Sequence, residues 1–173
     1  MLVSWNWLKK YVALDMEVSE LEIRLAMAGL NHEGTRSVGD DFAIDLEVTS
    51  NRPDCLGQIG VAREISVLWN QSLNLPDPQP TATGPSIHDS LKIRIDAPEL
   101  CSRYIGRIIR GVKIGPSPQW MQDQLATVFL PLNKDWKPVN NVVDIGNYVL
   151  METGQPLHTF DLKELFGGEV VVR

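Results

Sequence analysis

The chain has 173 residues, 43% of them hydrophobic and 22% charged, which is the composition of a soluble globular protein with one substantial core or two small ones. Acidic side chains outnumber basic ones by 22 to 16, so the protein lacks the overall positive charge that attracts nucleic-acid phosphates. The apolar run at the N-terminus is short and its two lysines lie on the wrong side for a signal peptide. We therefore expect a cytoplasmic protein without a membrane segment.

Metal and cofactor sites are not expected from the motifs of this chain. Cys55 and Cys101 form no CxxC pair, and His32, His88 and His158 are scattered without HxxxH or HxH spacing. Neither GxGxxG nor GxxxxGK[ST] occurs, so no nucleotide-binding loop is indicated. The sequence predicts no metal and no cofactor in these residues.

Residues 1–72 predict a small domain of three helices with one or two short strands. Ser4 opens the first helix, and Ser19 with Glu22 has the spacing of a capping box that starts a second helix ending near Gly29.

Alternating apolar residues at positions 42–48 predict a strand, after which Asp54 is expected to cap the third helix. Gly57 and Gly60 weaken that helix, so their presence suggests that another segment packs closely on its first turns.

Residues 73–87 contain four prolines and are predicted to be an extended linker. The following domain, 88–173, is expected to have strands at 91–95 and 104–114 and a helix after Ser117. Strands flanking helices indicate a mixed α/β layer, and therefore an α+β chain overall. A last strand that stops at the chain end predicts that this domain is truncated at Arg173.

The stretch Asn140–Asp161 is the most informative segment. Its helix is expected to stop near Thr153, because Gly154 and Pro156 are the usual end of a helix. Asp161, three residues before a glutamate, is expected to cap a second short helix.

Asn147 lies on the predicted helix of this stretch and His158 in the turn that follows it, which brings the two residues towards the same place. A histidine held beside a primary amide can orient a water or a carbonyl group, because imidazole titrates near neutrality and the amide both donates and accepts. The alternative is structural, with a buried histidine donating to a backbone carbonyl and Asn147 bonded to a helix neighbour. Spacing alone favours this structural alternative.

Basic residues cluster between positions 103 and 113. Arg103 and Arg107 would share one face of a strand and are possible RNA contacts, whereas Arg110 would fall on the other face. A solvated sheet face explains the cluster equally simply and is the commoner case.

Long strings of the sequence resemble the N-terminal part of the β-subunit family of bacterial phenylalanyl-tRNA synthetases, a class II aminoacyl-tRNA synthetase. The matching strings are SWNWLKKYV, LAMAGLNHEG, LEVTSNRPDCLGQIGVAREI, RYIGRIIRGVKIGPSPQWM and NNVVDIGNYVLMETGQPLHTFD. The resemblance implies a winged-helix-like first domain and, from about residue 88, half of an editing module that hydrolyses tyrosine wrongly attached to tRNA(Phe). It also implies a synthetase α subunit as partner in an α2β2 enzyme, with ATP and Mg²⁺ used by the whole enzyme.

Carried over residue by residue, the editing positions are Gly146, Asn147 and His158. Gly146 stands where the family commonly has a threonine, so the expected pocket lacks one hydroxyl. Many members also insert an OB-fold tRNA-binding domain where this chain has only the six residues from Ser37 to Phe42.

Two functions follow. The leading one is a part of the β subunit that contributes to aminoacylation and editing but is inactive alone, because the residues that read the tyrosine hydroxyl lie beyond Arg173 in the family. The alternative is a non-catalytic module that binds RNA or another subunit, in which His158 is structural.

Overall fold

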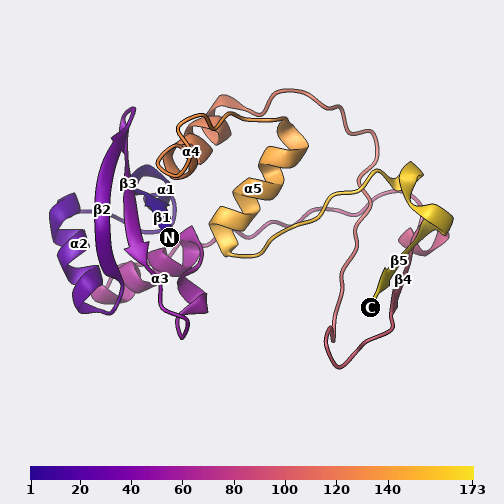
Figure 1. Cartoon of the computed structure of the whole chain (residues 1–173), viewed down its shortest axis with the longest axis horizontal. Helices are drawn as coiled ribbons and strands as arrows, with labels where there is room; N and C mark the ends of the chain where they lie inside the picture. The colour runs from indigo at the N-terminus through magenta and orange to yellow at the C-terminus, as the bar shows by residue number, and fades with distance from the viewer. The chain divides into compact units, whose positions relative to one another are not determined.

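The computed structural model describes all 173 residues, and their packing forms two compact units. Unit 1 comprises Met1–Asp77 and Ile114–Leu157, and unit 2 comprises Pro78–Lys113 and His158–Arg173. Helices and two small sheets make up the chain, which confirms the predicted α+β class (Figure 1). None of the helices is long and apolar enough to cross a membrane.

The units divide the chain differently from the sequence-based grouping. Residues 114–157, which the sequence groups with 88–113, pack with the N-terminal segment in unit 1. Residues 73–83 have no regular secondary structure, as the Pro-rich composition predicts. The units describe packing, and the domain boundaries at 72 and 88 stay a prediction.

Unit 1 contains an antiparallel sheet in the order β1-β3-β2 (Figure 1). Its strands are β1 (Leu2–Ser4), β2 (Asn31–Val38) and β3 (Asp41–Glu47). Strand β3 matches the predicted alternation, whereas β2 was missed because its sequence, NHEGTRSV, carries almost no apolar residues to mark a buried face. A turn containing Gly39, at φ 57°, joins these two strands.

Three helices surround this sheet, and their starts test the predicted caps. They are α1 (Trp5–Leu8), α2 (Val18–Met27) and α3 (Gln58–Leu68). The Ser4 side chain accepts from the Trp7 amide at 2.9 Å, so the first predicted cap is confirmed.

The other two predicted caps are wrong. Helix α2 starts at Val18, one residue before Ser19, so the serine lies inside the helix and its capping-box partner Glu22 instead accepts from the Thr35 hydroxyl. Asp54 lies in a separate 3-10 turn (Pro53–Cys55), and Gly57 occupies the N-cap of α3. Because of this extra turn, α3 starts at Gln58 rather than directly after Asp54.

Two further helices, α4 (Gln119–Phe129) and α5 (Asn141–Thr153), complete unit 1. Met121 and Leu125 of α4 join the core, which is shared with α1, α2, α3 and the sheet. The largest fully buried apolar side chains are Trp7, Leu8, Leu21, Leu25, Leu30, Ile44, Leu46, Ile65 and Leu125.

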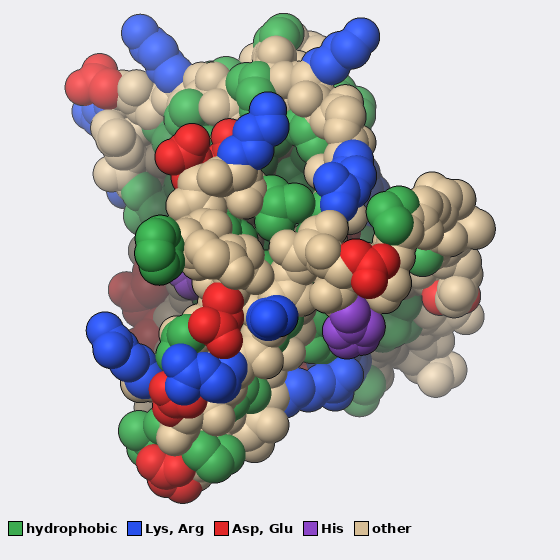
Figure 2. All heavy atoms as spheres, turned by 90° about the vertical axis from the view of Figure 1, so that its right-hand side faces the viewer, with side chains coloured by type: hydrophobic (Ala, Val, Ile, Leu, Met, Phe, Trp, Pro, Cys, Tyr) green, Lys and Arg blue, Asp and Glu red, His purple; other side chains and the backbone are tan.

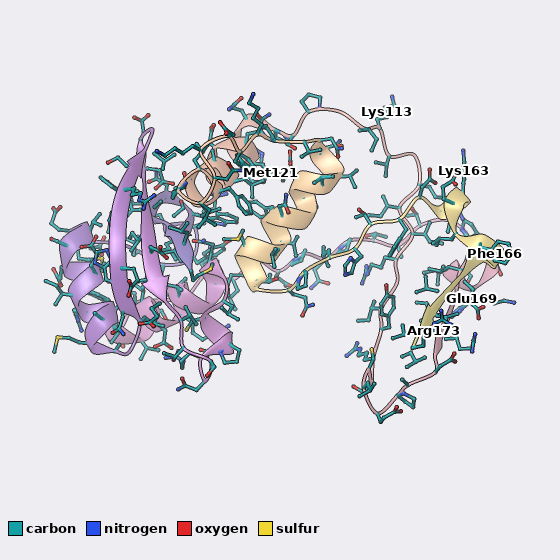
Figure 3. All side chains as sticks on the ribbon, viewed as in Figure 1. Lys113, Met121, Lys163, Phe166, Glu169 and Arg173 are labelled. Atoms are coloured by element: carbon teal, nitrogen blue, oxygen red, sulfur yellow. The ribbon has the colours of Figure 1, made fainter.

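Unit 2 has a parallel pair of strands, β4 (Lys92–Ile95) and β5 (Glu169–Val172). Asp161 caps a short 3-10 helix (Leu162–Glu164) by accepting from the Lys163 amide, as expected. Leu91 is the one buried apolar residue of unit 2, while Phe166 beside β5 is 99% exposed (Figure 3).

Residues 104–114 form no strand, contrary to the prediction. The half-buried residues Tyr104, Gly106 and Ile108 still alternate with exposed ones, so the pattern on which the prediction rested is real. No neighbouring backbone bonds to residues 104–112, and a strand exists only where such a partner is present.

Candidate functional site

Asn147 lies in the middle of α5, a helix with well-defined ends. The Asn140 side chain accepts from the amides of Val142 and Val143, and Gly154 ends the helix in the left-handed conformation at φ 77°. The predicted stop at Thr153 is confirmed. The amide of Asn147 is half-buried.

Gly146 precedes Asn147 on the helix and faces open space. A Cβ atom built on Gly146 would have no neighbour within 4 Å. The position therefore has room for a Cβ atom.

His158 is the first residue of the second segment of unit 2 and is exposed. Its ring lies near that of Phe160, with 6.3 Å between centroids and an interplanar angle of 29°. The structure therefore does not show the buried histidine of the structural alternative. Asn147 belongs to unit 1 and His158 to unit 2, and their catalytic roles stay predictions.

A cluster of aromatic and polar side chains, missed by the sequence reasoning, holds α5 within unit 1. The Tyr11 hydroxyl donates to Glu152 at 2.5 Å and accepts from the Trp7 indole nitrogen at 2.8 Å. Trp7 also stacks on Tyr148, with centroids 4.4 Å apart. Tyr11 and Glu152 are 141 positions apart in the chain, so no local pattern could have linked them.

Burial shifts the pKa values of three side chains in and beside this cluster. Burial, together with the neighbouring Glu152 carboxylate, raises the pKa of Tyr11, so the phenol stays a proton donor at neutral pH. The pKa of Tyr148 is raised to about 12 for the same two reasons. Partial burial lowers the pKa of Lys10, whose ammonium group lies 4.8 Å from the Trp120 ring centroid and donates to Gln124.

At the start of α3, backbone lies directly against the backbone at the end of α5. A Cβ atom on Gly57 would lie 2.7 Å from the Gly154 nitrogen and 2.8 Å from the Glu152 carbonyl oxygen. At Gly60 a Cβ would lie 1.8 Å from the Asp54 carbonyl oxygen. Close packing on the first turns of this helix, predicted from the two glycines, is therefore confirmed.

Arg103 and Arg107 of unit 2 are both exposed. Arg110 differs from them, because its guanidinium donates to the Ser90 hydroxyl at 2.9 Å. On the face drawn in Figure 2, lysines and arginines are interspersed with acidic and apolar side chains. RNA contacts by Arg103 and Arg107 stay a prediction.

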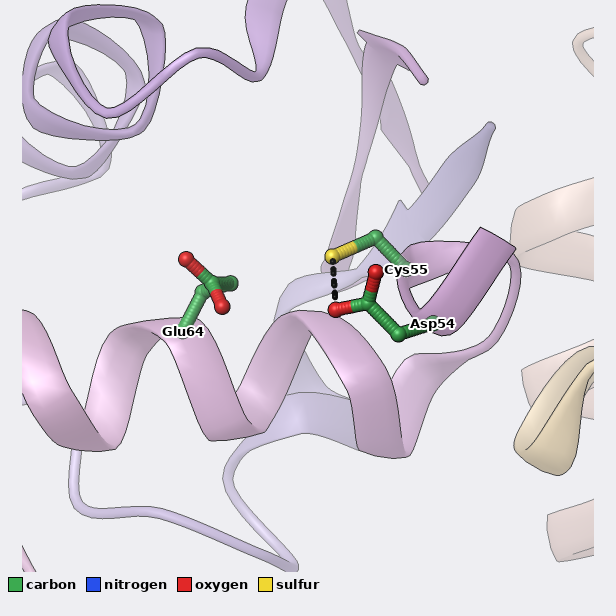
Figure 4. Close-up of side chains that lie close together, drawn as sticks. All are labelled: Asp54, Cys55 and Glu64. Atoms are coloured by element: carbon green, nitrogen blue, oxygen red, sulfur yellow. Dashed lines mark hydrogen bonds between the residues drawn. The ribbon is translucent and has the colours of Figure 1, made fainter. Parts of the chain in front are cut away.

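Asp54, Cys55 and Glu64 form the one group whose atoms lie close enough to hold a metal ion, within 4.8 Å of one another (Figure 4). The Arg52 guanidinium already bonds to all three, at 2.8 Å from Asp54, 3.0 Å from Cys55 and 2.7 Å from Glu64. Its hydrogen bonds lower the pKa of Asp54 to about 2, while burial and Asp54 raise the pKa of Cys55 to about 12. This group is an ion-pair network whose cation is Arg52.

Comparison with known proteins places these features in a family. Residues 100–173 match the family model of the B3/4 domain. The whole chain is 52% identical to the phenylalanine–tRNA ligase β subunit of Rhodopirellula baltica, of which it covers 24%.

The β subunits of Anaeromyxobacter dehalogenans and Symbiobacterium thermophilum are 46% and 43% identical over 134 and 136 residues. These matches cover 78% of the chain in each case and 16% and 15% of those proteins. The chain thus spans a quarter or less of the length of the curated relatives it matches.

Proposed function

Because this chain belongs to the family of phenylalanine–tRNA ligase β subunits, we propose that it is part of such a ligase and forms one wall of its editing site. The observation that supports this most is the 52% identity to the Rhodopirellula baltica β subunit, because the match extends over all 173 residues and so includes the stretch that carries Asn147 and His158. The reaction is hydrolysis of tyrosine from wrongly charged tRNA(Phe).

An aminoacyl ester is already activated, so its hydrolysis needs a positioned water, a stabilised oxyanion and a selective pocket. The exposed imidazole of His158 can orient the water or the terminal ribose of the tRNA, and the Asn147 amide can donate to an oxygen of the ester. General acid-base assistance of this kind contributes about 10² to 10⁴ in rate. In the family, the residues that select tyrosine lie in the second half of the editing module, which follows the part that matches this chain.

The whole enzyme is a cytoplasmic class II synthetase with α2β2 composition. Its aminoacylation centre, which uses ATP and Mg²⁺, lies on the α subunit. Residues 1–173 contribute no aminoacylation chemistry of their own and are inactive alone. Phenylalanine, tyrosine and tRNA(Phe) are accordingly ligands of the assembly.

The test compares tyrosyl-tRNA(Phe) hydrolysis by the whole enzyme and by its His158→Ala and Asn147→Ala variants. We expect both variants to lose at least about 10²-fold in hydrolysis rate while charging with phenylalanine continues. Residues 1–173 alone are expected to release no tyrosine. Full hydrolysis by both variants would contradict the editing role.

The alternative is a module that binds RNA or a second subunit, and the exposure of Arg103 and Arg107 is the observation that favours it. A salt titration of tRNA binding by residues 1–173 separates the two functions. Phosphate contacts give a steep fall of affinity with salt, which the double variant Arg103→Gln/Arg107→Gln would then flatten. The acidic net charge leads us to expect weak binding.

A further inference from the structure

Helix α5, which carries Asn147, is attached to the N-terminal part of unit 1 at three points. We propose that Tyr11 and Glu152, supported by Trp7 and Gly57, are positioning residues that set the place of Asn147 in the editing site. The proposal rests on the proposed function and adds residues that never touch the substrate.

The first point of attachment is the ring of Tyr148, the neighbour of Asn147 in the chain. Fully buried Trp7 stacks on it at an interplanar angle of 24°, and Trp120 meets its edge with centroids 5.4 Å apart. A ring held on its face and at its edge cannot turn without losing both contacts. These contacts fix the rotation of α5 about its axis beside Asn147.

The second point lies one helical turn further on, at Glu152. Its carboxylate accepts a hydrogen bond from the Tyr11 hydroxyl, whose oxygen in turn accepts one from the Trp7 indole nitrogen. Tyr11 is only 4% exposed, so its hydroxyl has no water as a ready substitute for the Glu152 carboxylate. Because Tyr148 and Glu152 are four residues apart, both attachments act on the same face of the helix.

The third point fixes the position of α5 along its axis. The backbone of Gly154 and Glu152 lies against Gly57 so closely that any side chain at position 57 would have to displace it. With rotation and translation both set, the backbone of Asn147, and so the point from which its amide extends, has one position relative to the core of unit 1. A displacement of about 1 Å in such a group can cost about 10²-fold in rate.

The experiment uses the whole enzyme and measures single-turnover hydrolysis of tyrosyl-tRNA(Phe) at several enzyme concentrations. Tyr11→Phe removes the donor, Glu152→Ala removes the acceptor, and Glu152→Gln keeps an acceptor oxygen in place. We expect the first two variants to lower the maximal hydrolysis rate by about 10-fold or more, with half-saturation unchanged, and Glu152→Gln to restore most of it. Charging with phenylalanine should be unaffected.

Thr127→Val is the matched control, because it removes another buried hydroxyl of unit 1, one that bonds only within its own helix to the Asp123 carbonyl. An equal loss of hydrolysis in this control would show general loosening and overturn the proposal. Unchanged hydrolysis in Tyr11→Phe and Glu152→Ala would also overturn it, provided that His158→Ala abolishes the reaction. If His158→Ala and Asn147→Ala are themselves fully active, the proposed function fails instead.

Discussion

At the scale of single residues, Gly57 and Gly146 show that surroundings decide what a glycine contributes. Both lie at or in a helix of unit 1, yet a Cβ atom would be 2.7 Å from backbone at Gly57 and would meet nothing within 4 Å at Gly146. Packing therefore requires glycine at position 57 but not at position 146, where glycine lowers the stability of the helix.

We expect Gly146→Ala to raise the free energy of unfolding of residues 1–173 by up to about 1 kcal/mol, because alanine favours the helix interior over glycine by that amount. Urea titration followed by circular dichroism measures the change. Gly57→Ala is the matched variant and should lower the midpoint instead, since α5 must shift. A lower midpoint for Gly146→Ala would mean that α5 packs on another segment at this position.

At the scale of elements, buried Asp144 bonds the first turn of α5 to the residues that precede α4 and α5. Its carboxylate accepts from the Ser117 hydroxyl before α4 and, at 3.1 Å, from the Val139 amide before α5. Removing the carboxylate would leave the buried Ser117 hydroxyl without this partner and would break the bond to the Val139 amide.

We expect Asp144→Ala to lower the free energy of unfolding by about 3 kcal/mol, the sum of two hydrogen bonds to a charged group less partial relaxation. Thermal and urea unfolding of residues 1–173 measure it. Asp123→Ala, on the exposed side of α4, should change stability by no more than about 0.5 kcal/mol. Equal effects of the two substitutions would show that Asp144 does not hold α5.

How far the sequence could predict each element depended on whether its cause was local. Gly154 and Ser4 act within a few residues, and the structure has both ends where they were expected. Strand β2 is stabilised by pairing with β3 rather than by its own side chains, so its polar sequence gave no sign of it. The Tyr11–Glu152 bond joins distant parts of the chain and was out of reach for the same reason.

The candidate site was predictable only through resemblance. Spacing placed Asn147 on a helix and His158 in the turn after it, and α5, which carries Asn147, indeed ends at Thr153. Exposure of His158 and the open space at Gly146 depend on tertiary surroundings that no local pattern encodes.

At the scale of the molecule, the two units differ in how much core they bury. Unit 1 contains nearly all of the buried apolar side chains, whereas residues 104–112 of unit 2 expose Ile105 at 65% and Ile109 at 79%. Stability is therefore expected to be uneven along the chain.

We expect amide hydrogens of residues 104–112 to exchange with solvent near the rate of an unfolded peptide, since their backbone has no bonded partner. Amides of α3 and β3 should be protected for far longer. Hydrogen exchange followed by mass spectrometry on residues 1–173 makes the comparison, with β4 and β5 as an internal reference inside unit 2. Strong protection at 104–112 would mean that this segment pairs with another strand in solution.

The turn between β2 and β3 has a consequence for how this architecture can change. Ser37 pairs with Phe42 and Val38 with Asp41, so the chain leaves one strand and enters the next at neighbouring points of the sheet. A polypeptide spliced in at Gly39 and Asp40 would begin and end about 5 Å apart, the spacing of paired strands, whatever its size. The register of the sheet and the core below it would be the same with or without it. An accessory domain inserted at this hairpin would therefore replace only the turn between β2 and β3.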